Sequence, residues 1–500
     1  MHQTAQLIHD LTVFAAQADA GRSADDLAAA LVRLAVTGSS PDEALRTLAT
    51  LRPGTWVRLD ARLRQWPWLA AADDQRLQIT DPARAASDPL ALLLTACVYD
   101  GHLRQRAVNT PLMRRDQRLL PVLLIRTTDW APPVRDDARA ALDEALGAAD
   151  TAGLVRAAGV AMALRAWRRG DYAATAVTEA MRTRSDETLD AARASADRQV
   201  RRLGYRLWLE SSRTDSEALV RTALTERDIV CQRLCAEAVV RAAVRDRRRD
   251  TLDRLLAARF ARVRAEALDG LVQLGRPEAA EALLSDRSAV VRSTAQWAMR
   301  RAGRDAAEHY RAMLVAGDGV TLRGAVAGLG ECGTADDARL VADYLRHDRP
   351  RVRAEAVRAV RRLGGPLGQI ADMLTDPAPI VVRAATATLR GQPDLVRIDR
   401  LWELLGTDQP AHARRAAFRL LIARDTWTRI EADLVLVADD QLGARARSDL
   451  SSWLQRGAAT AYEILPTSTR DRIGRLLDAA EPDIGAEKAR LLRWHLGLWR

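Results

Sequence analysis

Apolar and polar positions along this chain repeat with a step of about 31 residues, which is a period typical of helical solenoids. Each copy has an apolar residue followed by an arginine and, three positions later, a small residue, as in Val352, Arg353 and Ala356. Residues four apart lie on one face of a helix, so each copy is predicted to contain a helix that begins just before the arginine. The arginines of the series are Arg104, Arg135, Arg201, Arg233, Arg264, Arg292, Arg323, Arg353, Arg383, Arg414 and Arg445.

The flanks of each copy also repeat. An aspartate precedes most of the arginines by four to seven residues, where it is predicted to cap the next helix and complement its dipole. Several copies close with Leu-Gly, as at 274–275, 329–330 and 363–364, and glycine suits a left-handed helix end. The gap between Arg135 and Arg201 is two periods long, so it predicts one degenerate copy, and the section 148–196 is the least regular.

The Asp…Val-Arg-x-x-Ala…Leu-Gly pattern resembles HEAT repeats over roughly residues 88–460, in particular the short HEAT-like form of phycobilisome-lyase-type, ARM-type α-solenoid proteins. The resemblance implies that two antiparallel helices form one repeat and that aspartate and arginine form a ladder between successive repeats. Carried over to this sequence, each ladder arginine is partnered by its upstream aspartate. The expected ladder residues are Asp129, Arg135, Asp228, Arg233, Asp286, Arg292, Asp318, Arg323, Asp348, Arg353, Asp376, Arg383, Asp408 and Arg414.

The predicted fold is therefore all-α, an α-solenoid of about 11–12 HEAT-like helical hairpins. We expect an N-terminal helical module at 1–85, the repeat array at 86–460 and capping helices at 461–500. Trp56, Trp66 and Trp68 are interpreted as packing the module onto the first repeats, with a partner pocket as the alternative. The closing helices are interpreted as covering the last open face, with a partner or self-association site as the alternative. Their apolar residues are Leu491, Leu492, Trp494, Leu496 and Trp499.

Composition agrees with an elongated intracellular protein. The 500 residues exceed the size at which one compact core keeps growing. No apolar run is long enough to span a membrane, and the N-terminus lacks the pattern of a secretory signal. Four cysteines do not make a disulfide framework. The sequence thus predicts a cytoplasmic protein without a membrane partner and leaves the oligomeric state open.

The net charge of +10 and the pI of about 10.2 suggest a nucleic-acid partner. Lys488 is, however, the only lysine among the 76 basic residues, a ratio that favours GC-rich coding bias over a selected phosphate-binding surface. The positive excess is largest in residues 151–300. At the offset of Arg300 and Arg361 from their ladder arginines, the other repeats carry no common basic residue, so no basic stripe is predicted. The candidate anion-binding residues are Arg241, Arg245, Arg248, Arg300 and Arg361.

Catalytic motifs are weak in this chain. Residues 328–333 match G-x-G-x-x-G, but the dinucleotide fingerprint needs a strand before it, and here the glycines close a predicted helix. Cys231 and Cys235 lack a second pair of metal ligands nearby. We therefore predict no catalytic residues, no metal site and no cofactor.

The favoured function is a non-catalytic HEAT-repeat scaffold that binds a protein or peptide partner on a concave face lined by the second helices. The alternative is a nucleic-acid-binding HEAT-like protein that resembles AlkD-type DNA glycosylases, which use a basic concave face. Their active-site motif does not map onto residues of this sequence.

Overall fold

The computed structural model describes residues 2–65, 73–211, 215–317, 319–460 and 466–498. The described chain is all-α and contains no β-strand, and the predicted α-solenoid is confirmed. It forms two compact units, Met1–Arg245 with Ala258–Val263, and Asp246–Ala257 with Arg264–Arg500. No helix in these ranges is both long and apolar enough to cross a membrane.

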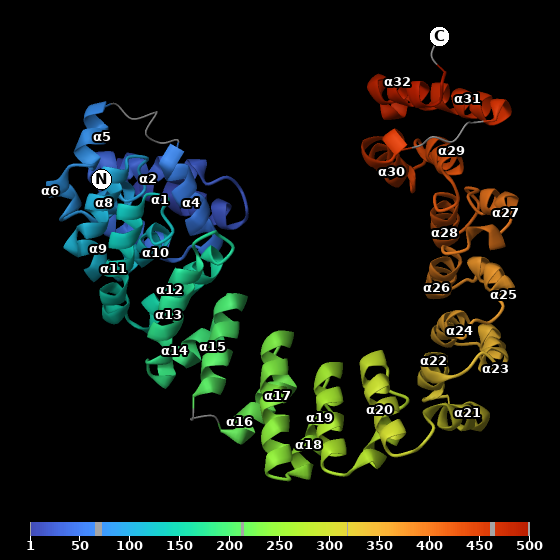
Figure 1. The fold of residues 1–500 in the computed structure, drawn as a ribbon. Coiled ribbons are helices and arrows are strands. Elements are labelled where there is room, and N and C mark those ends of the chain that lie inside the picture. The colour runs from blue at the N-terminus through green and yellow to red at the C-terminus, as the bar shows by residue number, and fades with distance from the viewer. Residues whose placement is uncertain (1, 66–72, 212–214, 318, 461–465, 499–500) are drawn as a thin grey trace. The chain divides into compact units, whose positions relative to one another are not determined.

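Up to Arg245, the described part of the first unit contains α-helices and one short 3-10 helix, and Figure 1 labels most of the α-helices. The α-helices are α1 (His2–Asp19), α2 (Asp25–Thr37), α3 (Pro41–Ala49), α4 (Pro53–Gln65), α5 (Asp73–Ile79), α6 (Pro82–Ala85), α7 (Pro89–Thr95), α8 (Gly101–Asn109), α9 (Pro111–Arg115), α10 (Leu120–Arg126), α11 (Pro132–Ala148), α12 (Thr151–Leu164), α13 (Asp171–Arg182), α14 (Asp186–Ala194), α15 (Arg198–Glu210), α16 (Ser216–Thr225) and α17 (Ile229–Arg245).

The second unit contains the helices from α18 onward, with α19 belonging to it from Arg264. They are α18 (Arg249–Leu256), α19 (Ala261–Gln273), α20 (Ala289–Arg301), α21 (Ala306–Ala316), α22 (Leu322–Cys332), α23 (Asp337–Ala342), α24 (Pro350–Arg362), α25 (Gly368–Asp372), α26 (Pro379–Leu389), α27 (Ile398–Glu403), α28 (Ala411–Leu421), α29 (Thr426–Leu436), α30 (Gly443–Arg456), α31 (Thr467–Ile484) and α32 (Ala486–His495).

Within each unit, consecutive helices form hairpins whose second helices pack side by side. In the first unit these second helices are α8, α11, α13, α15 and α17, and in the second unit α20, α22, α24, α26 and α28 follow the same order. The inner ones of each row are covered by their own first helix on one side and by neighbouring second helices on two others. The remaining exposed side is called the second-helix face below.

Buried small residues set the close spacing of the second helices. Ala138, Ala295, Ala356 and Ala417, each three positions after a ladder arginine, are completely buried. Gly330 is also part of this packing, because a Cβ placed there would collide with Ala359 of the next second helix. Small side chains at these positions let the helix backbones approach.

Two of the Leu-Gly endings behave as predicted, and one does not. Gly275 and Gly364 take left-handed backbone conformations, with φ of 78° and 70°, as expected for a glycine just after a helix. Gly330 instead lies inside α22, which runs on to Cys332. The G-x-G-x-x-G match at 328–333 therefore lies mostly within a helix, and its glycines serve helix packing.

The ladder arginine tethers the turn in front of its own helix. In five copies it occupies the fourth position of the second helix and donates to the carbonyl six residues upstream. Arg135 Nη1 reaches Asp129 O at 3.2 Å, Arg292 Nη1 reaches Asp286 O at 2.7 Å, and Arg353 Nη1 reaches His347 O at 2.8 Å. Arg104 and Arg201 do the same with Val98 O and Ser195 O.

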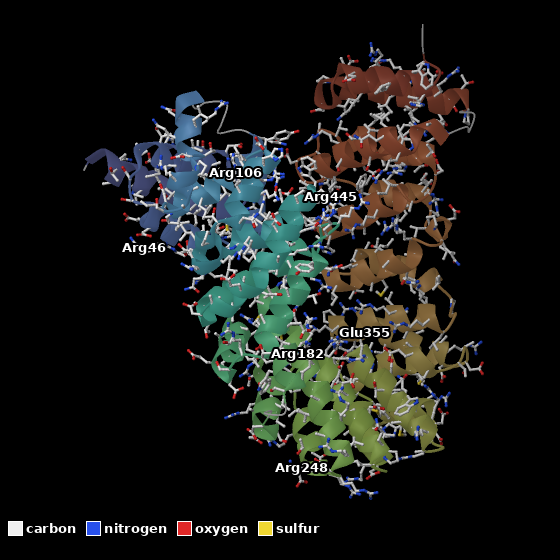
Figure 2. The ribbon with its side chains drawn as sticks, turned by 60° about the vertical axis from the view of Figure 1, so that its left-hand side comes forward. Arg46, Arg106, Arg182, Arg248, Glu355 and Arg445 are labelled. Atoms are coloured by element: carbon white, nitrogen blue, oxygen red, sulfur yellow. The ribbon has the colours of Figure 1, made fainter. Side chains whose placement is uncertain are left out.

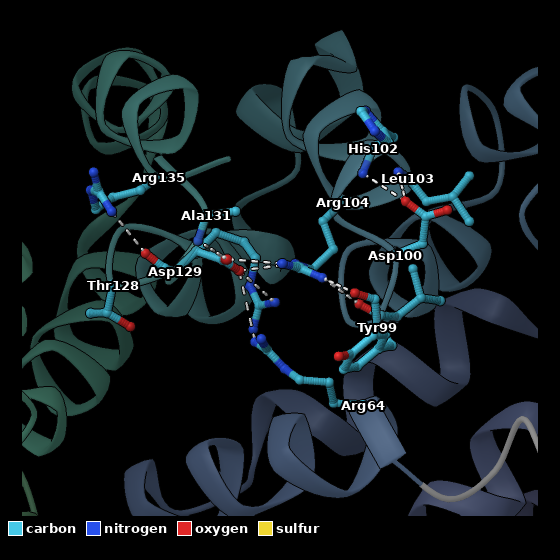
Figure 3. A network of polar contacts seen from close by, with 12 residues as sticks. Arg64, Tyr99, Asp100, His102, Leu103, Arg104, Thr128, Asp129, Ala131 and Arg135 are labelled. Carbon is cyan, nitrogen blue, oxygen red and sulfur yellow. Dashed lines mark hydrogen bonds and ion pairs between the residues drawn. The ribbon is translucent and has the colours of Figure 1, made fainter. Parts of the chain in front are cut away.

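The same guanidinium also reaches forward to the next copy. Arg353 binds both carboxylate oxygens of Asp376 at 2.8 Å, and Arg264 binds those of Asp286 at 2.9 and 2.8 Å. The aspartate in turn accepts from the amide two residues later, as Asp376 does from Ala378 N at 2.8 Å. The carboxylate of each of these aspartates therefore pairs with the arginine of the preceding repeat, and not with the arginine that follows it in the chain. Arg104 with Asp129 (Figure 3) and Arg414 with Asp439 form the same rung.

Other expected ladder residues have different partners. Arg292 pairs with Glu331 and Arg323 with Glu355, because the longer glutamates reach these arginines from within the following helices. Asp228 pairs with Arg202, and Arg233 lies 3.6 Å from Glu237 of its own helix. Asp348 offers only its backbone carbonyl to Arg353, the exposed Asp408 accepts from Gln409, and Asp318 lies outside the described residues.

Arg383 is displaced from the ladder by one helical position. It is the fifth residue of α26, and the buried Val382 takes the fourth position. One residue rotates a side chain by about 100° around a helix, so Arg383 points to solvent on the second-helix face. The resemblance placed it in the ladder, and the structure does not pair it with any described residue.

Replacing Arg353 by alanine is expected to lower the stability of the second unit by about 2–4 kcal/mol, because a largely buried Asp376 loses its charged partner. Arg358 in the same helix is more than a third exposed and makes one i,i+3 pair with Glu355. Its replacement by alanine is expected to cost less than about 1 kcal/mol. Chemical unfolding of the two variants measures the difference, and equal midpoints would contradict a structural role for the Arg353–Asp376 rung.

Candidate functional site

The degenerate copy is α13, which occupies a second-helix position without a ladder arginine. Its fourth residue is Ala174, only 6% exposed, where most of the other copies carry the arginine. The row of rungs is therefore interrupted at this helix. Two grooves open on the surface, one on each side of α13.

The larger groove has a volume of about 720 Å³ and lies between α11 and α13. Small side chains on α13 leave the space open. Its lining residues are Asp143, Leu146, Gly147, Tyr172, Thr175, Ala176, Glu179, Ala180, Thr183 and Arg184.

Two contacts hold the walls of this groove in place. The Arg139 guanidinium lies over the Tyr172 ring at 4.4 Å, and Tyr172 donates to Arg139 O at 3.4 Å. Arg184 Nη2 donates to the carbonyls of Leu146 and Gly147, both at 2.8 Å, at the end of α11. These donors satisfy carbonyls that the helix itself leaves free. Asp143 is exposed and has no partner among the described residues, so the groove offers one free carboxylate.

The smaller groove, about 380 Å³, lies between α13 and α15 and is closed on one side by residues of α12. Arg182 (Figure 2) bridges Glu179 and Glu210, the latter at 3.0 Å, and these two carboxylates raise the pKa of Arg182. Charges here neutralise one another. Thr175 and Glu179 line both grooves, so the two grooves form one surface that crosses α13. We call this surface the α13 surface.

The α13 surface has the chemistry of a binding site. Its described lining residues include alanine, threonine, leucine and tyrosine with paired charges, and neither histidine nor cysteine is among them. Concave surfaces of mixed apolar and polar character are typical of recognition sites.

The five candidate anion-binding arginines lie in different places. Arg241 and Arg245 are exposed on α17 of the first unit, and Arg248 (Figure 2) is exposed just before α18. Arg300 and Arg361 are exposed in the last turns of α20 and α24, which α22 separates. Positive charge at a helix C-terminus complements the helix dipole, which gives these two arginines a local role. The five do not form one cluster on a single element.

The sequence did not point to Tyr172, Asp143 or Glu179. The double-length gap between Arg135 and Arg201 was the available signal, because α13 lies inside it. A missing arginine marks the copy where the surface opens. The identity of the lining residues depends on how three helices meet, which no short motif records.

No protein-family model matches the chain, and no curated protein matches it in sequence. Among solved structures, the chain is similar to the condensin Cnd3–Cnd2 subcomplex of S. pombe, at 14% identity and a TM-score of 0.34, over 93% of this chain and 83% of that one. It is also similar to the karyopherin Kap121p bound to the extreme C-terminus of the phosphatase Cdc14p, at 13% identity and a TM-score of 0.24. That match covers 98% of this chain and 51% of the karyopherin, so the chain spans about half its length.

An engineered protein is similar at 15% identity and a TM-score of 0.16, over 94% of this chain and 98% of that one. TM-scores below 0.5 carry no argument about function. The hairpins and their stacked second helices define the class by themselves: the chain is an all-α helical-repeat protein.

Proposed function

We propose that this protein is a non-catalytic scaffold that binds a protein or peptide partner on its second-helix face, through the α13 surface. The observation that carries the proposal is the pair of adjoining grooves on either side of α13, the degenerate copy. Repeat proteins present extended surfaces of this kind to their partners. Cytoplasmic location, the separate module at 1–85 and the cap at 461–500 belong to the same proposal.

The lining of the α13 surface suggests what the partner segment carries. The exposed Tyr172 ring and the flanking alanines offer an apolar anchor point, and aromatic side chains are enriched among residues that dominate binding energy. Asp143 supplies a carboxylate without an internal partner. A segment with an apolar side chain next to an arginine or lysine fits this combination.

Filling the grooves tests the proposal. Thr175 is exposed and lines both grooves, so Thr175→Trp is expected to block them while leaving the buried face of α13 intact. Affinity capture from the native host, quantified by mass spectrometry, should lose the bound partner at least tenfold. Ser293→Trp is the matched control, because Ser293 is exposed on the second-helix face of α20.

The control variant is expected to retain the partner at the level of the unmodified protein. Equal capture by Thr175→Trp and Ser293→Trp would contradict binding at the α13 surface. Capture of no partner by the unmodified protein, together with measurable turnover of a substrate, would reject the scaffold function itself.

A further inference from the structure

Three neighbouring second helices of the second unit, α24, α26 and α28, share an unusual charge composition. The structure describes all three completely, and Glu355 is their only acidic residue. Seven exposed arginines lie on or directly after them. Two of these, Arg361 and Arg362, end α24, and Arg362 lies 3.9 Å from Glu331. We call the other five the basic face; it consists of Arg351, Arg383, Arg390, Arg415 and Arg419.

The basic face lies on one side of the helix layer. Arg383 and Arg390 are seven residues apart on α26, and Arg415 and Arg419 are four apart on α28, so each pair lies along one helical stripe. Helix α26 packs between α24 and α28 and against its own first helix, which leaves only the second-helix side exposed. Packed helices are about 8–10 Å apart. The arginines therefore form a grid rather than scattered points.

These side chains are not used by the fold. None of the five makes a side-chain hydrogen bond or an ion pair with a described residue, whereas Arg353 and Arg414 in the same helices are bound into the ladder. Glu355 does not neutralise them either, because Arg323 and Arg358 already hold it at 3.0 and 3.1 Å. Coding bias explains arginine in place of lysine, but it does not explain why three neighbouring helices carry a single acidic residue.

An acidic protein segment fits this surface poorly. No exposed large apolar side chain lies on α24, α26 or α28, each of which is described in full, so the surface lacks the apolar anchors that usually dominate protein interfaces. Exposed ion pairs alone contribute only about 0–1 kcal/mol each.

A phosphate backbone fits it better. Guanidinium groups bind phosphate oxygens in pairs, and neutralising a regular row of phosphates releases condensed counterions, which is favourable without any apolar contact. The helices also expose no phenylalanine, tyrosine or tryptophan on which single-stranded bases could stack.

We infer that the basic face binds the phosphate backbone of a double-stranded nucleic acid without reading its sequence. This surface is in the second unit and is independent of the α13 surface in the first. The protein would then hold a protein partner and a nucleic acid at separate places.

Fluorescence anisotropy with a labelled 30-base-pair DNA of random sequence tests this inference on the full chain. With about five phosphates neutralised, affinity is expected to fall about 100- to 1,000-fold between roughly 50 and 200 mM salt. The fourfold variant R383E/R390E/R415E/R419E should abolish binding at low salt without lowering the melting temperature. The matched control is R22E/R33E/R46E/R106E, which makes the same charge change at exposed arginines of the first unit; Figure 2 labels Arg46 and Arg106. The affinity of this control for the duplex should be within about threefold of that of the unmodified protein, because the substituted arginines lie outside the proposed binding site.

Three outcomes would overturn the inference. Absence of binding at low salt would remove the nucleic-acid partner, and equal losses in both fourfold variants would show that only net charge matters. Polyglutamate that binds more tightly than the duplex, and displaces it, would point to an acidic protein segment. A duplex RNA of equal length identifies which nucleic acid is preferred. A negative Thr175→Trp result leaves this test unaffected, because the duplex assay does not depend on the α13 surface.

Discussion

Replacing Asp129 by alanine is expected to destabilise the first unit by about 3–5 kcal/mol, enough to unfold the hairpins around it under mild denaturing conditions. The carboxylate is completely buried between two completely buried arginines (Figure 3). Arg104 binds both of its oxygens at 2.9 Å, and Arg126 donates to Oδ2 at 3.3 Å. Its removal leaves two guanidinium charges that water cannot reach.

The network of charged groups around Asp129 explains why the expected loss of stability is large. Burial by itself would raise the pKa of Asp129, but the hydrogen bond from Arg104 and the charge of Arg126 hold it below its usual value. Arg126 also binds Asp60 of α4, while its Nε has no partner among the described residues. The network thus joins the N-terminal helices to two hairpins. Asp129→Asn should lower stability nearly as much as Asp129→Ala, because asparagine keeps the shape of the side chain but removes its charge.

Asp100 provides the matched control. It precedes Arg104 in the chain as Asp129 precedes Arg135, but it is exposed and only caps α8 through the amides of His102 and Leu103. Asp100→Ala is expected to cost about 1 kcal/mol. Hydrogen exchange of peptides from α4, α8, α10 and α11 measures both variants locally, with the second unit as an internal reference. Similar protection in the two variants would contradict the buried-charge account.

The repeat architecture was predictable because its signal recurs in most copies. An apolar residue, an arginine and a buried alanine such as Ala356 report helix phase directly, and a period of about 31 residues fixes the hairpin. The rung partners were less accessible. An upstream aspartate can pair with the arginine that follows it or with the arginine of the previous copy. Only the coordinates show that Asp376 pairs with Arg353 of the previous copy.

The α13 surface and the basic face could not be predicted from the sequence, for a different reason. Whether an arginine enters the ladder or faces solvent depends on a single helical position, as Val382 and Arg383 show. Arg300 and Arg361 were chosen as candidates for anion binding at an offset of eight residues from their ladder arginines, and Arg241, Arg245 and Arg248 because arginines are dense there. The exposed stripe on α28 instead begins one residue after Arg414. Helix starts were not known to that accuracy from sequence.

Replacing Asp433 by asparagine is expected to stabilise the second unit near pH 8 by about 2–4 kcal/mol. Asp433 lies in α29, is completely buried, and neither carboxyl oxygen has a hydrogen-bond partner among the described residues. Arg429, the nearest cation, is already bound to Asp449 at 2.6 and 2.8 Å. Burial raises the pKa of Asp433 to about 9, and the charge of Asp449 acts in the same direction, while Arg429 opposes it.

The sign of the pH dependence follows from proton binding. In the unfolded chain an aspartate has a pKa of about 3.9, so between roughly pH 4 and 9 the folded state holds a proton that the unfolded state has released. Stability therefore falls as pH rises through this window. Asparagine resembles the protonated carboxyl in shape and does not ionise. The stabilising effect of Asp433→Asn should be near zero at pH 4.5 and should grow steadily toward pH 8.

The measurement is the melting temperature of the second unit, together with hydrogen exchange in α29–α31, at both pH values. Asp440→Asn is the control, since Asp440 is exposed and makes no ion pair with a described residue; it should change stability by less than about 0.5 kcal/mol at either pH. If the Asp433→Asn variant is less stable than the unmodified protein at pH 8, the ionised carboxylate is favourably bound in the folded state. In that case Asp433 would belong to a charge network with Arg429, and burial would not be the dominant influence on it.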